Sequence, residues 1–217
     1  MKIMKLPVCL VFLIFLHLDL SGQAEAGLRV SSGASYVRSG DQLYDRHGSS
    51  DPLFSWSIGV NIQKNLTSKM AGILELQTAR KGYSFQIRNY FDLNSIEAKR
   101  TKLSITLNAL SVYQWTLGTG KKKVQSFGLQ YGCFLTRNTL QRWKYGEQKP
   151  VNVDGSDKPW DTGFIVGAGY RNHLSKKKFL VIDFRYNQGL FDISTSPERT
   201  KSRSLEVGVC YAFAIKK

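Results

Sequence analysis

The residues best suited to catalysis lie together in one short segment. Asp45, His47, Ser49 and Ser50 combine a carboxylate, an imidazole and two hydroxyl groups. Nucleophilic hydrolases use these groups, but a catalytic triad is defined by its geometry, and proximity in sequence does not supply that geometry. The sequence therefore favours a protein without enzymatic activity, and lipid hydrolysis at this segment is the third alternative for its function.

Metal and cofactor sites find no support in the spacing of the remaining reactive residues. Beyond residue 26 the histidines are His47 and His173, and the cysteines are Cys133 and Cys210. Two separated histidines and two cysteines on different predicted strands supply no ligand set for zinc. Residues 118–121 contain glycines and a lysine without the spacing of a phosphate-binding loop. We expect no metal and no cofactor.

The N-terminus has the layout of an export signal. Lys2 and Lys5 precede an apolar stretch over residues 6–18, and small residues follow. A positive segment, a short apolar segment and a small-residue cleavage site define a secretory signal peptide. Ala24-Glu25-Ala26 offers one cleavage site and Gly22/Gln23 offers another. We therefore predict a signal peptide over residues 1–26 and one domain over residues 27–217.

The chain carries a formal net charge of +15, and all of it remains when residues 1–26 are removed, because that segment holds two lysines and two acidic residues. Hydrophobic residues make up 42% and aromatic residues 12% of the 217 residues, which excludes a disordered chain. A basic surface often indicates nucleic acid, but an exported protein rarely meets any, so no nucleic-acid partner is expected. An anionic membrane surface or polymer is the expected partner of these charges.

Apolar residues alternate with small or polar residues along most of the mature chain, as in strands with one apolar face. In residues 54–63, for example, Phe54, Trp56 and Ile58 alternate with serines and glycine. Eight such segments are found, two of them weaker than the rest: residues 28–37, 54–63, 72–81, 102–109, 126–135, 163–170, 180–187 and 204–213. The sequence thus predicts an all-β protein.

Three features favour an eight-stranded antiparallel up-and-down transmembrane β-barrel. Long connections, at about 38–53, 82–101, 137–161 and 190–203, alternate with short ones, as in bacterial outer-membrane barrels. Aromatic residues gather at the strand ends, where membrane interfaces would lie. The opposite strand face carries small polar residues, which suit a narrow barrel interior. A soluble lipocalin-like barrel in the periplasm, with apolar residues inside, is the alternative.

Five charged residues share the strand face that would point into the barrel: Glu75, Lys102, Asp183, Arg185 and Glu206. Pairing across residues 190–203 would place Asn187 opposite Glu206, with Arg185 on the diagonal. We predict a structural network of charges that plugs the interior, and an ion pathway is the alternative. Eight strands seldom leave an aqueous channel.

Residues 28–213 resemble the PorT-like family of outer-membrane β-barrels. The resemblance rests on residues 80–82, 128–132, 160–163, 167–170, 184–193 and 205–213, in their order and spacing. Residues 205–213 end on Phe213, which matches the terminal aromatic residue of such barrels, although four residues follow it. The resemblance implies an integral protein of the outer membrane, in some cases linked to secretion, and implies no shared catalytic activity or ligand.

Two further sets of residues are candidates for binding. The first set, in the predicted loop 137–161, is Arg142, Trp143, Tyr145 and Trp160. Exposed aromatic and basic residues are typical of recognition surfaces and of sites that hold lipopolysaccharide phosphates. The second set, in the predicted periplasmic turns, is Lys121, Lys122, Lys123, Lys176, Lys177 and Lys178. These lysines could dock a periplasmic protein, a component of a secretion machinery or a cell-wall polymer.

Overall fold

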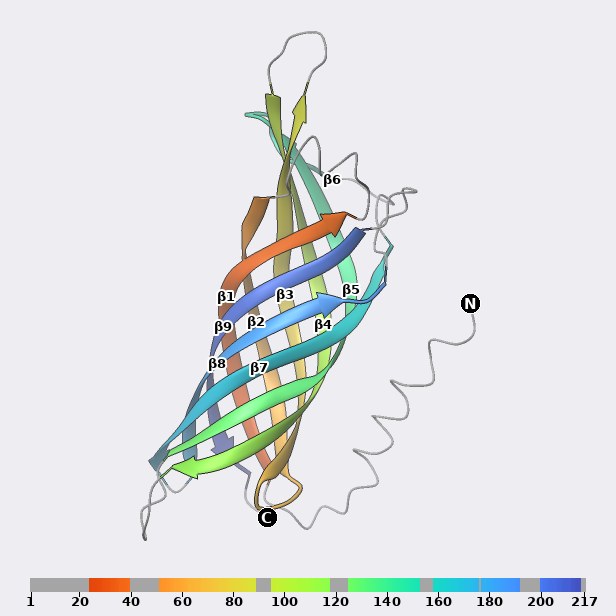
Figure 1. The fold of residues 1–217 in the computed structure, drawn as a ribbon. Helices are drawn as coiled ribbons and strands as arrows, with labels where there is room; N and C mark the ends of the chain where they lie inside the picture. The colour runs from red at the N-terminus through yellow and green to blue at the C-terminus, as the bar shows by residue number, and fades with distance from the viewer. Residues whose placement is uncertain are drawn as a thin grey trace.

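The chain folds into a closed antiparallel β-barrel, described here from a computed structural model (Figure 1). The structure describes residues 24–39, 51–88, 95–117, 125–152, 158–175, 177–191 and 200–215. The strands are β1 (Ala24–Ser39), β2 (Asp51–Asn65), β3 (Met70–Arg88), β4 (Ser95–Leu117), β5 (Gln125–Tyr145), β6 (Val151–Asn152), β7 (Trp160–Ser175), β8 (Lys178–Gly189) and β9 (Thr200–Ala214).

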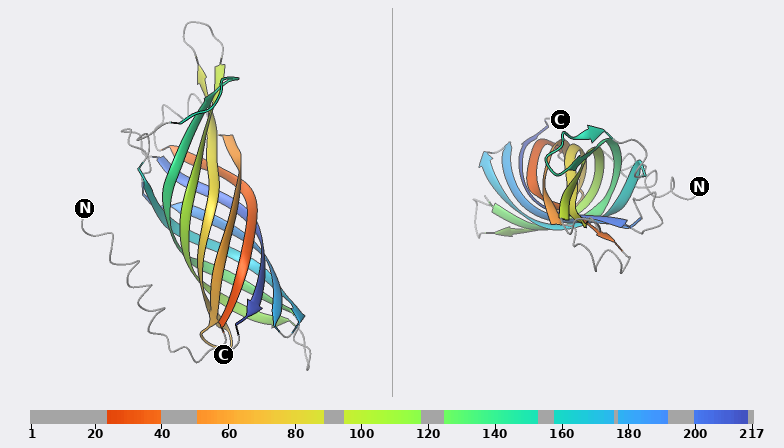
Figure 2. Two further views of the ribbon diagram at one scale, coloured as in Figure 1. Left: turned by 180° about the vertical axis from the view of Figure 1, so that it is seen from behind. Right: turned by 90° about the horizontal axis from the view of Figure 1, so that it is seen from above.

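Eight of these strands form the wall, each paired with its neighbours in sequence. The first and last strands close the ring, because β1 pairs with β9 from Glu25 opposite Ala214 to Ser39 opposite Thr200. The two-residue β6 pairs only with β5, outside the ring. Seen along the barrel, the strands surround one narrow interior (Figure 2). The predicted eight-stranded up-and-down barrel is confirmed. No helix in the described residues is long and apolar enough to cross a membrane.

The outer face of the barrel is apolar and the inner face is largely polar. Phe54 is 68% exposed and Val60 57%, whereas Ser55 and Asn61, their neighbours on β2, are buried inside. The same alternation runs along β9, where Val207 and Val209 are exposed and Glu206 is buried. This is the inverse of a lipocalin-like barrel, and it is the arrangement that a lipid bilayer requires of a β-barrel.

The interior is not polar throughout. One wall, formed by β3, β4, β5 and β7, carries an apolar cluster on its inner face, consisting of Ala71, Ile73, Leu110, Val112, Phe134 and Ile165. Phe179 on β8 also points inward and is buried against Cys210 and Ala212. Alternation alone does not distinguish these residues, because a large apolar side chain can fill the interior as well as face lipid.

The predicted loops 82–101 and 137–161 are mostly strand. β3 continues to Arg88 and pairs with β4 from Ser95, and β5 continues to Tyr145. These strands project beyond the rest of the wall at one end of the barrel (Figure 1), and we call residues 80–88, 95–103 and 140–145 the extension. Residues 97–102 of β4 and 141–144 of β5 carry polar side chains on both faces, so no apolar stripe marks these parts as strands. In β3, Tyr83, Phe85 and Ile87 do alternate with polar residues in the sequence, a signal that the sequence analysis did not use.

The two cysteines of the barrel provide a test of which face meets lipid. Cys133 is exposed between Ala109 and Phe164, whereas Cys210 is buried inside. A fluorescent maleimide attached to Cys133 in a Cys210→Ser protein should, after refolding into bilayers, be quenched by nitroxides on lipid acyl chains and not by iodide. In the matched Cys133→Ser protein, Cys210 should react with a charged maleimide only after unfolding. Quenching of the Cys133 probe by iodide would show that this face is in water.

Candidate functional site

The centre of the barrel holds a buried network of ionic side chains. Its lower half is built on Arg29 from β1, Asp183 and Arg185 from β8, and Glu75 from β3. Arg29 donates two hydrogen bonds to the Asp183 carboxylate, of 2.6 Å from Nη2 and 3.1 Å from Nε. Arg185 donates from Nη1 to the Glu75 oxygens at 3.0 and 3.2 Å, and its Nε lies 3.2 Å from Asp183. These bidentate, charge-assisted contacts are the strongest kind of side-chain hydrogen bond.

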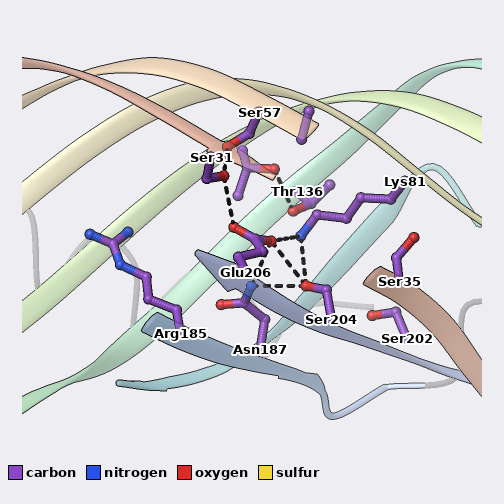
Figure 3. A network of polar contacts seen from close by, with 12 residues as sticks. Ser31, Ser35, Ser57, Lys81, Thr136, Arg185, Asn187, Ser202, Ser204 and Glu206 are labelled. Carbon is purple, nitrogen blue, oxygen red and sulfur yellow. Dashed lines mark hydrogen bonds and ion pairs between the residues drawn. The ribbon is translucent and has the colours of Figure 1, made fainter. Parts of the chain in front are cut away.

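The upper half of the network surrounds Glu206 on β9 (Figure 3). Lys81 Nζ lies 3.1 Å from Oε1 of Glu206, and Asn187 and Ser204 donate to the same oxygen at 2.8 and 3.0 Å. Ser31 donates to Oε2 at 3.3 Å. The Glu206 carboxylate is thus surrounded by donors from four strands. Arg29 Nη1 lies 3.8 Å from Glu75 and 3.9 Å from Glu206, so it links the two halves.

The charges of this network balance. Its cations are Arg29, Arg185 and Lys81, and its anions are Glu75, Asp183 and Glu206. Five of these six side chains are almost completely buried, and Lys81 is 24% exposed. Burying an ion is costly unless its partner and its hydrogen bonds are also present. Equal numbers of opposite charges allow the barrel to close around them.

Neutral side chains and glycines complete the network. Gln130 from β5 accepts from Arg185 at 2.9 Å, and Asn108 from β4 donates to Glu75 at 2.8 Å. On β9, a Cβ atom at Gly208 would lie 2.7 Å from Cζ of Arg29, and on β7 one at Gly167 would lie 3.1 Å from Cγ of Arg185. Glycine at Gly208 leaves the volume that the Arg29 guanidinium group occupies, and glycine at Gly167 leaves room for the β8 backbone and the stem of the Arg185 side chain.

The structure places all five predicted interior residues inside the barrel, and their pairing differs from the prediction. Arg185, not Asn187, lies opposite Glu206, and Asn187 lies opposite Ser204. The register is therefore displaced by two residues, which keeps every side chain on its expected face. Arg185 points away from Glu206 (Figure 3) and binds Glu75. Lys102 is also buried, and it lies beside a small space that Asp161 lines as well.

Arg29 and Lys81 complete the network, and the sequence analysis did not single them out. Both continue an inward alternation, Arg29 with Gly27 and Ser31, and Lys81 with Glu75. Extending the alternation through the two weaker strands would have found them. Such an extension would also have placed Glu25 inside. Glu25 is buried and pairs with Arg171 at 2.7 Å near the end of the barrel where β1 begins. Cleavage at Gly22/Gln23 would retain this pair in the mature chain.

The predicted recognition residues fall on strands, and the structure brings Trp143 and Tyr145 together on one face of β5, with Arg142 on the opposite face. On β5, Arg142 and Tyr145 are exposed, while Trp143 is half-buried, lies 4.8 Å from the Arg100 guanidinium and stacks on Tyr145. Trp160 begins β7 and lies further down the barrel, beside Arg137. Trp160 is therefore separate from the other three residues.

The predicted periplasmic turns are described only in part. Lys177 and Lys178 are exposed at the turn between β7 and β8. Lys121, Lys122, Lys123 and Lys176 lie outside the described residues, as do Asp45, His47, Ser49 and Ser50. In the part of the chain that the structure describes, no group of three or more histidine, cysteine or acidic residues could hold a metal ion.

Comparisons with solved structures return outer-membrane barrels of low sequence identity. The attachment invasion locus protein Ail of Yersinia pestis, solved with the heparin analogue sucrose octasulfate, is 13% identical, with a TM-score of 0.42, 88% of this chain and 99% of that chain covered. Neisserial surface protein A is 14% identical, with a TM-score of 0.44 and coverages of 85% and 95%. OprG from Pseudomonas aeruginosa is 12% identical, with a TM-score of 0.47 and coverages of 90% and 97%.

No family model matches this chain, and no curated protein sequence matches it. The class of protein follows instead from the chain's own closed wall, apolar outer face and charged interior. These features define an eight-stranded β-barrel of the outer-membrane type.

The balance of the network predicts how it responds to mutation. Arg185→Gln removes the cation that hydrogen-bonds Glu75 and leaves only the more distant Arg29, 3.8 Å away, beside this buried carboxylate. Breaking a buried pair costs about 3–5 kcal/mol. Urea unfolding of the protein in detergent should therefore show a clearly lower midpoint. The double variant Glu75→Gln/Arg185→Gln removes both charges and should recover part of this loss. If the single and double variants unfold alike, Glu75 and Arg185 are not energetically coupled.

Proposed function

We propose that this protein is a non-conducting outer-membrane barrel that acts by binding, through its extension on the outside and its basic rim on the periplasmic side. The observation that carries this proposal is the filled interior. The ionic network and the polar side chains bound to it come from six of the eight wall strands, β1, β3, β4, β5, β8 and β9, so the barrel centre is committed to holding the wall together. Binding is then left to the two ends of the barrel.

Two small spaces, of about 40 and 50 Å³, lie on either side of the network centre. Moving an ion between them would require the Arg29, Arg185 and Lys81 contacts to open together. This supports a structural plug over the alternative of an ion pathway.

The orientation follows from the lengths of the connections. The chain passes from β2 to β3 through the four residues 66–69, and from β7 to β8 through residues 176–177. Outer-membrane barrels have their short turns in the periplasm and their long loops outside. The extension, at the opposite end, therefore points out of the cell. Arg142 and Tyr145 on it are exposed, which suits recognition.

We also propose that the protein is a member of the PorT-like family and that it has a role in secretion or envelope organisation. A barrel with a plugged interior would contribute to secretion as a membrane-anchored partner of other proteins, not as the conduit. Outer-membrane lipid and lipopolysaccharide are its proposed surroundings. We propose no catalytic role, because the barrel interior is occupied by contacts between its own side chains.

The filled interior predicts the electrical behaviour of the protein. Purified barrel inserted in a planar lipid bilayer should add no steady conductance, because the charged network blocks the passage. Insertion is checked separately by gel mobility, where the unboiled protein should migrate differently from the boiled one. A stable open-channel current from protein that shows this heat shift would disprove the plug.

A second binding surface is supported by the charges at the periplasmic rim. Lys69, Lys177 and Lys178 are exposed there, and the acidic residue that the structure describes at this rim, Glu25, is buried. Such a rim would attract an acidic protein surface or an anionic cell-wall polymer.

Serine replacements test this surface. Changing Lys121–Lys123 and Lys176–Lys178 to serine should reduce co-purification of periplasmic partners after crosslinking in cells. Replacing Arg142 and Lys144, at the opposite end, serves as the matched control and should leave co-purification intact. Equal recovery from the lysine variant and the wild type would exclude docking through these turns.

A further inference from the structure

The outward face of the extension carries a basic groove. The groove adjoins the apolar outer face of the barrel wall, which we call the apolar belt. The volume of the groove is about 410 Å³, and its outward cations are Arg80 on β3, Lys99 on β4, and Arg142 and Lys144 on β5; the buried Lys102 also lines it. Arg80, Arg142 and Lys144 are exposed, and no carboxylate lines the groove among the described residues. Nearby, Glu97 pairs with Lys99 at 3.0 Å. The groove therefore keeps an excess of positive charge.

An irregularity in β5 creates this groove. The pairing between β4 and β5 shifts where Leu103 lies opposite Leu140 and Ser104 lies opposite Asn138, so Thr139 is an extra residue. An extra residue reverses the faces of every residue that follows it in the strand. Arg142 and Lys144 consequently point outward, and Trp143 contacts Arg100 on the other face.

The orientation proposed above would place the groove next to the lipid headgroups. Its lower lining is apolar, formed by Leu103 and Leu140. The next outward residues below these are Ile105 on β4, which is 48% exposed, and the exposed Arg137 opposite it on β5, whose Cζ lies 5.6 Å from the centre of the Trp160 ring. On β3, Thr78 follows Arg80, and Leu76, which is 50% exposed, then belongs to the apolar belt. Along the outward face of β3–β5, the side chains thus change from mainly aliphatic to cationic within a few residues toward the extension. A molecule with acyl chains below and phosphates above matches this order of chemistry.

We propose that the groove binds the phosphates of lipid A, the glycolipid anchor of lipopolysaccharide, with its acyl chains lying on the β3–β5 face of the belt. This inference rests on the proposed orientation of the barrel in the outer membrane. Several cations from three adjacent strands suit a headgroup with more than one phosphate. Guanidinium groups at Arg80 and Arg142 can each bind a phosphate with two hydrogen bonds. Lys144 adds charge without fixed geometry.

Binding of bisphosphorylated lipid A to the full-length mature protein in detergent tests the proposal. The variant Arg80→Ser/Arg142→Ser/Lys144→Ser should bind at least about tenfold more weakly, since it loses three charge-assisted contacts. The control Lys69→Ser/Lys177→Ser/Lys178→Ser removes equal charge from the opposite rim and should stay within about twofold of the wild type. The wild type should also prefer lipid A with phosphates over lipid A without them, and less so at high salt.

Three results would overturn the proposal: equal binding by the triple variant and the wild type, equal binding of dephosphorylated lipid A, or equally tight binding of phosphatidylglycerol, which would indicate a general phosphate surface. Gel mobility before and after boiling checks that each variant is folded. If the triple variant does not show the heat shift, the double variant Arg142→Ser/Lys144→Ser, at exposed positions, replaces it. Absence of the shift in the wild type would contradict the barrel itself, whereas a normal shift with unchanged lipid A binding contradicts only the groove.

Discussion

The fold depends on one constraint, which is that a strand in hydrocarbon must have all its backbone hydrogen bonds satisfied by other strands. The pairing of β1 with β9 and of β4 with β5 meets this constraint by closing the ring. Closure with eight strands fixes a narrow interior. The inward side chains then have to fill that interior and neutralise one another. The ionic network is therefore a consequence of closure as well as a support for it.

The network works as a unit because each charge has several partners. Arg185 contacts Glu75, Asp183 and Gln130, and Arg29 lies near all three carboxylates. The buried Arg29 Nη1 makes no hydrogen bond of its own, so it contributes mainly through charge. Single replacements leave a buried ion uncompensated, whereas paired replacements keep the balance. The interior is therefore constrained by its total charge more than by any one contact.

Sequence alone predicts the parts of this barrel that lie in the membrane. Alternation is strong in residues 54–63 and 204–213 because one face meets lipid and the other meets a polar interior. It is weaker in the extension, where polar side chains such as Arg100 also occupy the buried face, and so residues 82–101 were predicted to be loop. The inward positions of Phe134 and Ile165, and the extra residue at Thr139, depend on the opposing strands. No pattern within one strand could reveal them.

The candidate sites could also be predicted from the sequence only in part. The alternation of apolar and polar positions places four charged residues inside, since a charge cannot face hydrocarbon: Glu75, Asp183, Arg185 and Glu206. Which residue pairs with which depends on the strand register and on the room left by Gly167 and Gly208. The network is electrically neutral, so it contributes nothing to the net charge of +15. The excess positive charge must therefore lie outside the network. Lys69, Lys177 and Lys178 at one end, and Arg80, Arg142 and Lys144 at the other, contribute to it where anionic headgroups and polymers are within reach.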